Sequence, residues 1–301
     1  RKRQQFSKEV EEYRALLEKY PKDPRVYSAL ASTYELLQQD EKAADTYRAA
    51  LALDPKAIGN PTLRGHLATV YVRLKKFEAA RAIYEQLIKT QPTQAQHYAD
   101  LGQIYVQENQ RSAFLAWLQR KLEATPSDEV LFNYHYEEME RQKGAEATLK
   151  YLDDLSAKHK TDRKLQEAYA NALLSHFRAA KALVILQTLA DTYPNDLNAQ
   201  VNLVEALDKS GKQADATKHL IKITERKEIP ADVLLGFKRQ LGMRYLDAKQ
   251  PELAFPYLFA VAKGARNDFQ AVVIVADMLA KDGRDEEMLP IYGNILTLKG
   301  Q

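Results

Sequence analysis

Residues 23–55 read DPRVYSALASTYELLQQDEKAADTYRAALALDP, and this stretch decides the fold. Two groups of apolar side chains in it recur at the three- and four-residue spacing of one helix face. They are Tyr27, Leu30, Ala31 and Tyr34 in the first group and Ala43, Tyr47 and Ala50 in the second. The polar residues 38–41 separate the groups, and Pro55 follows the second, where a proline ends a helix. The stretch therefore predicts two short helices joined by a tight turn.

The order of these positions resembles the tetratricopeptide repeat, a helix–turn–helix unit of about 34 residues with aromatic, small and proline positions in this order. The prolines support the resemblance independently, because Pro21 and Pro55 are 34 residues apart, as are Pro92 and Pro126. The resemblance covers essentially the whole chain. It implies an all-α fold, an α-solenoid of antiparallel helix pairs wound as a right-handed superhelix.

About eight repeats fit the chain. Residues 1–22 are predicted to be the second helix of an incomplete leading repeat, 23–160 to hold repeats one to four, 161–228 repeats five and six, and 229–301 repeats seven and eight. In repeat three Phe114 replaces a small residue, which predicts a wider packing of the two helices. Pro256 and Pro290 lie inside second helices, so each of those helices should start late or be kinked.

In repeat four, His135 and Tyr136 replace the leucine and the small residue that the pattern expects. Aromatic residues are dense around this point, and they either fill the core, as aromatics ordinarily do, or anchor an interface. They are Phe114, Trp117, Phe132, Tyr134 and Tyr136.

The composition bounds the chemistry. The 301 residues include 44 basic and 41 acidic side chains spread along the chain, whereas a nucleic-acid surface usually needs a concentrated basic stripe. We therefore expect no nucleic acid partner. The absence of cysteine excludes disulfides, zinc ribbons and thiol nucleophiles. No signal peptide or membrane-spanning run is visible, and the localisation is left open between the bacterial cytoplasm and periplasm.

No constellation of catalytic residues is present. His135 and Glu138 are three residues apart, a spacing found in di-metal carboxylate sites, but no second such pair exists among the six histidines. We expect a packed or surface histidine. We predict no catalytic, cofactor-binding or metal residues, no cofactor, no small-molecule substrate and no enzymatic activity.

In proteins of the resembling family, ligands usually lie in the concave groove lined by the first helices. The corresponding positions in repeats one to three are Ser28, Ser32, Glu35, Thr69, Val72, Arg73, Gln103, Val106 and Gln107. These residues do not match the Lys, Asn and Arg of the subgroup that grips a terminal carboxylate, so we reject that clamp. The candidates for partner binding in repeats four to six are Asn133, Glu137, Glu140, Arg141, Lys164, Glu167, Asn171, Glu205, Asp208 and Lys209.

Acidic side chains outnumber basic ones in this central set, which favours a mildly basic or polar partner, although exposed charge is also the ordinary state of a surface. The predicted function is a non-catalytic scaffold that binds a protein or peptide partner. One alternative is a periplasmic or membrane-anchored arm of a bacterial polysaccharide-export or envelope-assembly machine. Another is the substrate-recruiting region of an enzyme whose catalytic domain lies elsewhere. Because the chain begins at Arg1, we expect a fragment, and membrane association only through a segment outside it.

Overall fold

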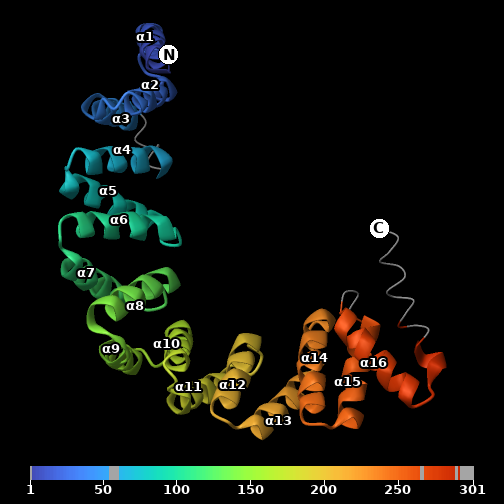
Figure 1. The fold of residues 1–301 in the computed structure, drawn as a ribbon. Coiled ribbons are helices and arrows are strands. Elements are labelled where there is room, and N and C mark those ends of the chain that lie inside the picture. Colours follow the sequence, from blue (N-terminus) through green and yellow to red (C-terminus); the bar gives the residue numbers. More distant parts are fainter. Residues whose placement is uncertain (1, 54–60, 265–267, 289–290, 292–301) are drawn as a thin grey trace. The chain divides into compact units, whose positions relative to one another are not determined.

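The computed structural model describes residues 2–53, 61–264, 268–288 and 291, which form sixteen α-helices and no strand (Figure 1). Pairs of helices follow one another along the chain, so the fold is an all-α solenoid, as the repeat pattern predicts. The helices are α1 (Lys2–Lys19), α2 (Pro24–Leu36), α3 (Asp40–Leu53), α4 (Pro61–Arg73), α5 (Phe77–Thr90), α6 (Ala95–Gln107), α7 (Arg111–Ala124), α8 (Glu129–Lys143), α9 (Ala145–Lys158), α10 (Arg163–Ser175), α11 (Ala179–Thr192), α12 (Leu197–Lys209), α13 (Gln213–Thr224), α14 (Ala231–Asp247), α15 (Pro251–Gly264) and α16 (Phe269–Lys281), followed by the short 3₁₀ helix η2 (Asp285–Met288).

The chain forms two compact units, Arg1–Leu165 and Gln166–Gln301, and the division falls within α10. In the first unit each helix from α1 to α9 packs against the next, and in the second the same holds from α11 to α16. A solenoid is stabilised in this way, by contacts between neighbouring repeats. The boundaries between groups of repeats that we gave from the sequence stay a prediction.

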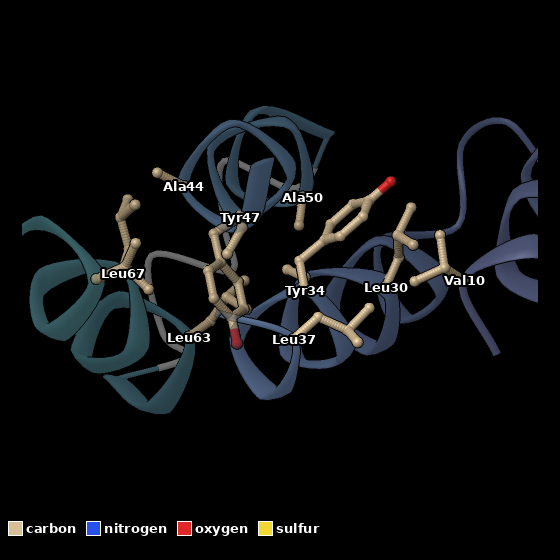
Figure 2. Close-up of a cluster of buried hydrophobic side chains, with 12 residues drawn as sticks. Val10, Leu30, Tyr34, Leu37, Ala44, Tyr47, Ala50, Leu63 and Leu67 are labelled. Carbon is tan, nitrogen blue, oxygen red and sulfur yellow. The ribbon is translucent and has the colours of Figure 1, made fainter. Parts of the chain in front are cut away.

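The core at the start of the first unit shows why residues 23–53 fold as they do. Small side chains at Ala31, Ala43 and Ala50 are fully buried and let α2 and α3 approach closely. The ring of Tyr47 is also fully buried, and Figure 2 shows it between Tyr34 on one side and Leu67 of the next repeat on the other. One aromatic residue thus joins two repeats, which predicts that they unfold together.

The turn inside each repeat is set by one residue in the left-handed conformation. Eight residues of the described chain have φ between 56° and 79°, one in each of these turns: Gln38, Lys75, Asn109, Gly144, Phe177, Gly211, Lys249 and Gly283. In seven of the eight, the next residue donates its N–H to the carbonyl five positions back, for example Gln39 to Tyr34 at 2.9 Å and Arg178 to Leu173 at 2.8 Å. This is the Schellman arrangement that ends a helix by satisfying its last carbonyls.

Repeat three departs from the template as the sequence predicts. A Cβ at Gly102 in α6 would lie 2.9 Å from a ring carbon of Phe114 in α7, so the glycine makes room for the aromatic ring. The backbones of α6 and α7 also stay farther apart than those of α2 and α3. The wider packing is confirmed: the second helix carries Phe114 where repeat one carries Ala43, while the first helix keeps a small residue, Gly102 in place of Ala31.

The prediction for the interior prolines has two forms, a late helix start or a kink, and the first is wrong for Pro256. Helix α15 begins at Pro251 and runs through Pro256 to Gly264, so a late start that would place Pro256 in the first turn is wrong. A kink at Pro256 stays a prediction, because proline removes one backbone hydrogen bond from the helix. Pro290 lies outside the described residues, and so does Pro55. None of the described helices has both the length and the apolar character that crossing a membrane requires.

Candidate functional site

The first-helix face of repeats two and three carries a hollow of about 440 Å³. Hydroxyl, amide and imidazole groups surround it, together with one carboxylate. The lining residues are Thr62, Gly65, His66, Thr69, Tyr84, Gln91, Gln94, Gln96, His97 and Asp100. Most of them come from α4 and α6, the first helices of successive repeats, and Thr69 is the one lining residue among the groove positions predicted for repeats one to three.

Tyrosines of the second helices reach this face with their hydroxyl groups. The Tyr47 hydroxyl lies 3.0 Å from the Ser32 hydroxyl, and the Tyr84 hydroxyl lies 3.5 Å from the Thr69 hydroxyl. Both pairs are fifteen residues apart in the sequence, so the arrangement recurs in two successive repeats. Burial raises the pKa of both tyrosines above the ordinary value of 10, and these hydroxyls therefore act as neutral hydrogen-bonding groups.

A histidine of the following repeat lies against each of these tyrosines. The ring of His66 stacks on Tyr47 with centroids 5.8 Å apart, and the ring of His97 lies 6.5 Å from Tyr84. Burial lowers the pKa of His97, and its ring nitrogen lies 3.1 Å from the Gln91 amide oxygen. A neutral imidazole has one donor and one acceptor, which suits it to pair with peptide groups.

Charged groups beside the hollow are paired with one another. Glu35 accepts a hydrogen bond from the Tyr47 hydroxyl at 2.6 Å and pairs with the Arg73 guanidinium at 2.9 Å. Arg73 also contacts Asp40 at 2.7 Å, and its hydrogen bonds to the two carboxylates raise its pKa further. The cluster ties the first helix of repeat two to repeat one. The groups on this face that remain available to a partner are mostly neutral hydrogen-bond donors and acceptors.

The central set of candidates divides between the two units. Asn133, Glu137 and Arg141 are exposed on α8, and Lys164 is exposed at the start of α10. Glu140 is half-buried on α8. Arg141 forms an ion pair with the buried Glu138 of its own helix, so part of its charge is already compensated.

The second unit holds Glu167, Asn171, Glu205, Asp208 and Lys209. Glu205 and Lys209 pair with each other at 2.7 Å, one turn apart on α12. Asp208 accepts hydrogen bonds from both terminal nitrogens of Arg244 on α14. These ion pairs reduce the acidic excess that the sequence indicates. The pair between Asp208 and Arg244 joins two helices, so counting charges along one helix does not reveal it. The groove role of all ten residues stays a prediction.

The aromatic residues of repeats three and four fill the core. Phe114, Trp117 and Phe132 are buried, and Tyr134 and Tyr136 are half-buried. Interface anchors of this kind need exposed rings, so the interface alternative for this cluster is wrong.

The His135–Glu138 pair does not form a metal site. His135 is fully buried against Tyr151, with ring centroids 4.5 Å apart, whereas Glu138 turns to Gln142 at 2.7 Å and to Arg141. The described residues contain no group of three or more side chains suited to hold a metal ion.

Sequence reasoning missed the contribution of the second helices to the first-helix face. The sequence pattern places Tyr47 on a packing face and indicates no role at this face for Tyr84, His66 or His97. The available signal was a hydroxyl residue followed fifteen positions later by tyrosine, at the same place in repeats one and two.

The family is decided by comparison with known proteins. Two family models, both of the tetratricopeptide repeat, match residues 6–58 and 41–101. The chain contains tetratricopeptide repeats. The matched residues include the hydroxyl, tyrosine and histidine side chains of the first-helix face described above, namely Ser32, Tyr47, His66, Thr69, Tyr84 and His97.

Two curated relatives share similarity with this tetratricopeptide repeat protein. One is the phagocyte signaling-impaired protein of Drosophila pseudoobscura pseudoobscura, 28% identical over 164 residues, which are 52% of this chain and 15% of that protein. The other is anaphase-promoting complex subunit 3 of Schizosaccharomyces pombe, 23% identical over 203 residues, which are 67% of this chain and 30% of that protein. The chain thus spans a third or less of the length of either relative.

Solved structures are similar in fold. YrrB, described as a TPR protein with an unusual peptide-binding site, is 19% identical, with 63% of this chain and 96% of that chain covered and a TM-score of 0.33. A tetratricopeptide repeat protein from Parabacteroides merdae is 14% identical, with 87% and 97% covered and a TM-score of 0.37. The human IFIT1 dimer with m7Gppp-AAAA is also 14% identical, with 97% and 77% covered and a TM-score of 0.42. At these TM-scores the likenesses say nothing about the partner.

Proposed function

We propose that this tetratricopeptide repeat protein is a non-catalytic scaffold that binds an extended segment of a partner protein on the first-helix face of repeats one to three. Repeats of this family indicate protein–protein interaction in general. The observation that carries the finer proposal is the hollow of about 440 Å³ lined by hydroxyl, amide and imidazole groups. An extended peptide presents backbone N–H and C=O groups that need both donors and acceptors, and these side chains offer both.

The electrostatics of the face support a polar partner more than a strongly charged one. Arg73 pairs with both Glu35 and Asp40, so its charge is fully engaged and the cluster keeps one excess negative charge, and Asp100 is the carboxylate that lines the hollow itself. Removing a charged partner's hydration shell costs free energy unless an opposite charge replaces it, and here the strongest charges are already engaged. Recognition therefore rests on hydrogen bonds and on contact with the Tyr84 and His97 rings.

The test is affinity capture with the intact protein and with two matched triple variants. His66→Ala, Thr69→Ala and Gln96→Ala together remove exposed groups from the hollow. Asp45→Ala, Arg48→Ala and Glu78→Ala remove three exposed polar groups from the second helices of repeats one and two. We expect the partners captured by the parent to be lost with the first variant and kept with the second. Equal capture by both variants would refute the proposal.

We further propose that the central candidates of each unit contribute to binding a mildly basic or polar partner. Glu137 and Glu205 are exposed, and neither pairs with another helix in the described structure. Reversing both to lysine should weaken capture of a basic partner, and unchanged capture would discard this role.

The two alternative settings, an envelope-assembly arm and the recruiting region of an enzyme, also stay open as proposals. The alignment with only 15% and 30% of the two curated relatives is compatible with a piece of a larger protein. The full-length sequence would decide between them, because a lipobox, a spanning helix or a catalytic domain would adjoin these repeats. That the chain binds no nucleic acid likewise stays a prediction from its charge distribution.

A further inference from the structure

Phe177 is an outlier among the turns that join the two helices of each repeat. The left-handed position in the other seven turns is occupied by glycine, asparagine, glutamine or lysine. Phe177 has φ 57° and is 95% exposed, so a large apolar side chain stands in water on a backbone that disfavours it. Neither helix packing nor turn geometry calls for phenylalanine at this position. A strained residue that is also exposed and apolar is a reason to look for a binding role.

The helix that follows this turn borders a hollow of about 580 Å³ in the second unit. Leu183 and Val184 of α11 form one wall, and Val184 is 68% exposed. Lys212, Lys218 and Lys222 line the opposite side, on α13 and the residue before it. Phe177 stands in the turn that leads into α11, outside the residues that line the hollow but on the same chain segment as its Leu183 and Val184 wall. The hollow lies between second helices, whereas the groove candidates of this unit are on first helices.

The charge of this surface is unbalanced. The three lysines face one lining carboxylate, Asp215, which approaches Lys218 to 3.9 Å with both side chains mostly exposed. Among the described residues, neither Lys212 nor Lys222 has an ion-pair partner. Exposed apolar groups beside unpaired ammonium groups suit a ligand that is apolar on one side and acidic on its flank.

We propose that α11, α13 and the Phe177 turn form a docking surface for an acidic amphipathic segment of another protein. Apolar side chains of that segment contact Val184 and Phe177, and its carboxylates pair with Lys212 and Lys222. A nucleic acid strand is the less suitable occupant, because single strands stack successive bases on several aromatic rings, whereas this surface combines an aliphatic wall at Leu183 and Val184 with one exposed phenylalanine, Phe177. This surface is independent of the first-helix face.

The test measures binding of two short fluorescent probe peptides to the whole protein by anisotropy. One probe has leucine at helical spacing and glutamate elsewhere, and the other has every glutamate replaced by lysine. We expect the acidic probe alone to bind, and to bind less tightly as ionic strength rises. Reversing Lys212 and Lys222 to glutamate should weaken this binding about tenfold, because two attractive contacts become repulsive. Reversing the exposed Lys143 and Lys150 of the other unit should leave it unchanged.

Phe177→Gly separates loss of binding from loss of folding. It places glycine where Gly144, Gly211 and Gly283 occupy the same turn position in other repeats, so the variant should melt at the same temperature as the parent or higher. We expect it to bind the acidic probe about tenfold more weakly, since it loses a large apolar contact. The proposal is overturned if the acidic probe does not bind, if either the lysine reversal or Phe177→Gly leaves its affinity unchanged, or if a single-stranded RNA displaces it.

Discussion

Replacing His135 by leucine should make the first unit both more stable and less sensitive to acid. The imidazole is fully buried in α8, and neither of its ring nitrogens has a hydrogen-bond partner. Leucine is the residue that the repeat pattern expects at this position. Each buried polar atom without a partner costs about 1–3 kcal/mol, whereas loss of the ring contact with Tyr151 costs about 0.5–1.5 kcal/mol. With two such nitrogens, we expect a net gain of about 0.5–5 kcal/mol in the free energy of unfolding at neutral pH.

The acid sensitivity follows from the same burial. Burial lowers the pKa of His135 from 6.5 to about 4, so the unfolded chain binds this proton more readily than the folded chain. The stability that neutral His135 contributes is fully present above pH 6.5, the pKa of histidine in the unfolded chain. It is lost as the pH falls toward about 4, the pKa of His135 in the folded chain. Between pH 7 and pH 5 the loss amounts to about 2 kcal/mol, since each pH unit in this window is worth about 1.4 kcal/mol.

The assay is urea unfolding at a series of pH values, followed by the fluorescence of Trp117. This residue is the only tryptophan of the chain, is buried in α7, and belongs to the helix that packs against α8. The difference between the parent and His135→Leu cancels all other titrating groups. His135→Gln is the matched control, which removes the titration but keeps polar atoms at the site. It should lose the acid sensitivity without the gain at neutral pH.

A difference curve that is flat between pH 7 and pH 5 would refute this reasoning. It would mean that the histidine keeps its ordinary pKa, which requires hydration or a partner that the buried position does not provide. A fall in stability of His135→Leu at neutral pH would show that the ring contact with Tyr151 outweighs the cost of the unpaired nitrogens.

Two further predictions concern packing and the first-helix face. Gly102→Ala should destabilise the first unit by about 1–3 kcal/mol in the same unfolding assay, because its Cβ would lie 2.9 Å from the Phe114 ring. The double variant with Phe114→Ala should show coupling between the sites, and strict additivity would rule out the steric explanation. Tyr47→Phe should cost about 1.5–3 kcal/mol through its lost hydrogen bond to the Glu35 carboxylate, measured as a lower urea midpoint. Tyr84→Phe should cost less, because its neutral contact with a hydroxyl is longer; an equal or larger cost would contradict the assignment.

The fold could be predicted from the sequence because its signals are local and repeated. The spacing of Tyr27, Leu30 and Tyr34 specifies a helix face, and a proline marks the end of a repeat. Asp23 caps α2 by accepting the N–H of Arg25 at 2.9 Å, with Pro24 in the first turn, which is an ordinary helix start.

The left-handed turn residues could be predicted only in part. Glycine at position 211 indicates a left-handed turn residue, because glycine adopts positive φ readily. Lys75 and Phe177 adopt the same conformation, although neither residue type indicates it. At those turns the position in the repeat decides the backbone, since the chain must reverse there to pack the second helix on the first. Tertiary context overrides the local preference, and a residue-by-residue interpretation cannot foresee it.

The candidate site was predicted less well, because its geometry depends on contacts between repeats. The sequence locates Ser32 and Thr69 on the first-helix face, but it does not show that tyrosine hydroxyls of the second helices reach them. Ion pairs between repeats were missed for the same reason. Arg73 follows Glu35 by 38 residues and Arg244 follows Asp208 by 36, so one repeat length separates the partners.

These pairs between repeats have a consequence for recognition. Each joins the first helices of successive repeats, in the first unit at Glu35 and Arg73 and in the second at Asp208 and Arg244. Charges used in this way fix the relative orientation of neighbouring helices, which lowers the ordering cost when a partner binds. They are also unavailable to that partner, since breaking a half-buried pair would leave one charge uncompensated. The first-helix face should therefore bind through neutral donors, acceptors and rings, whereas the unpaired lysines at the docking surface on α11 and α13 leave charge available for an acidic ligand.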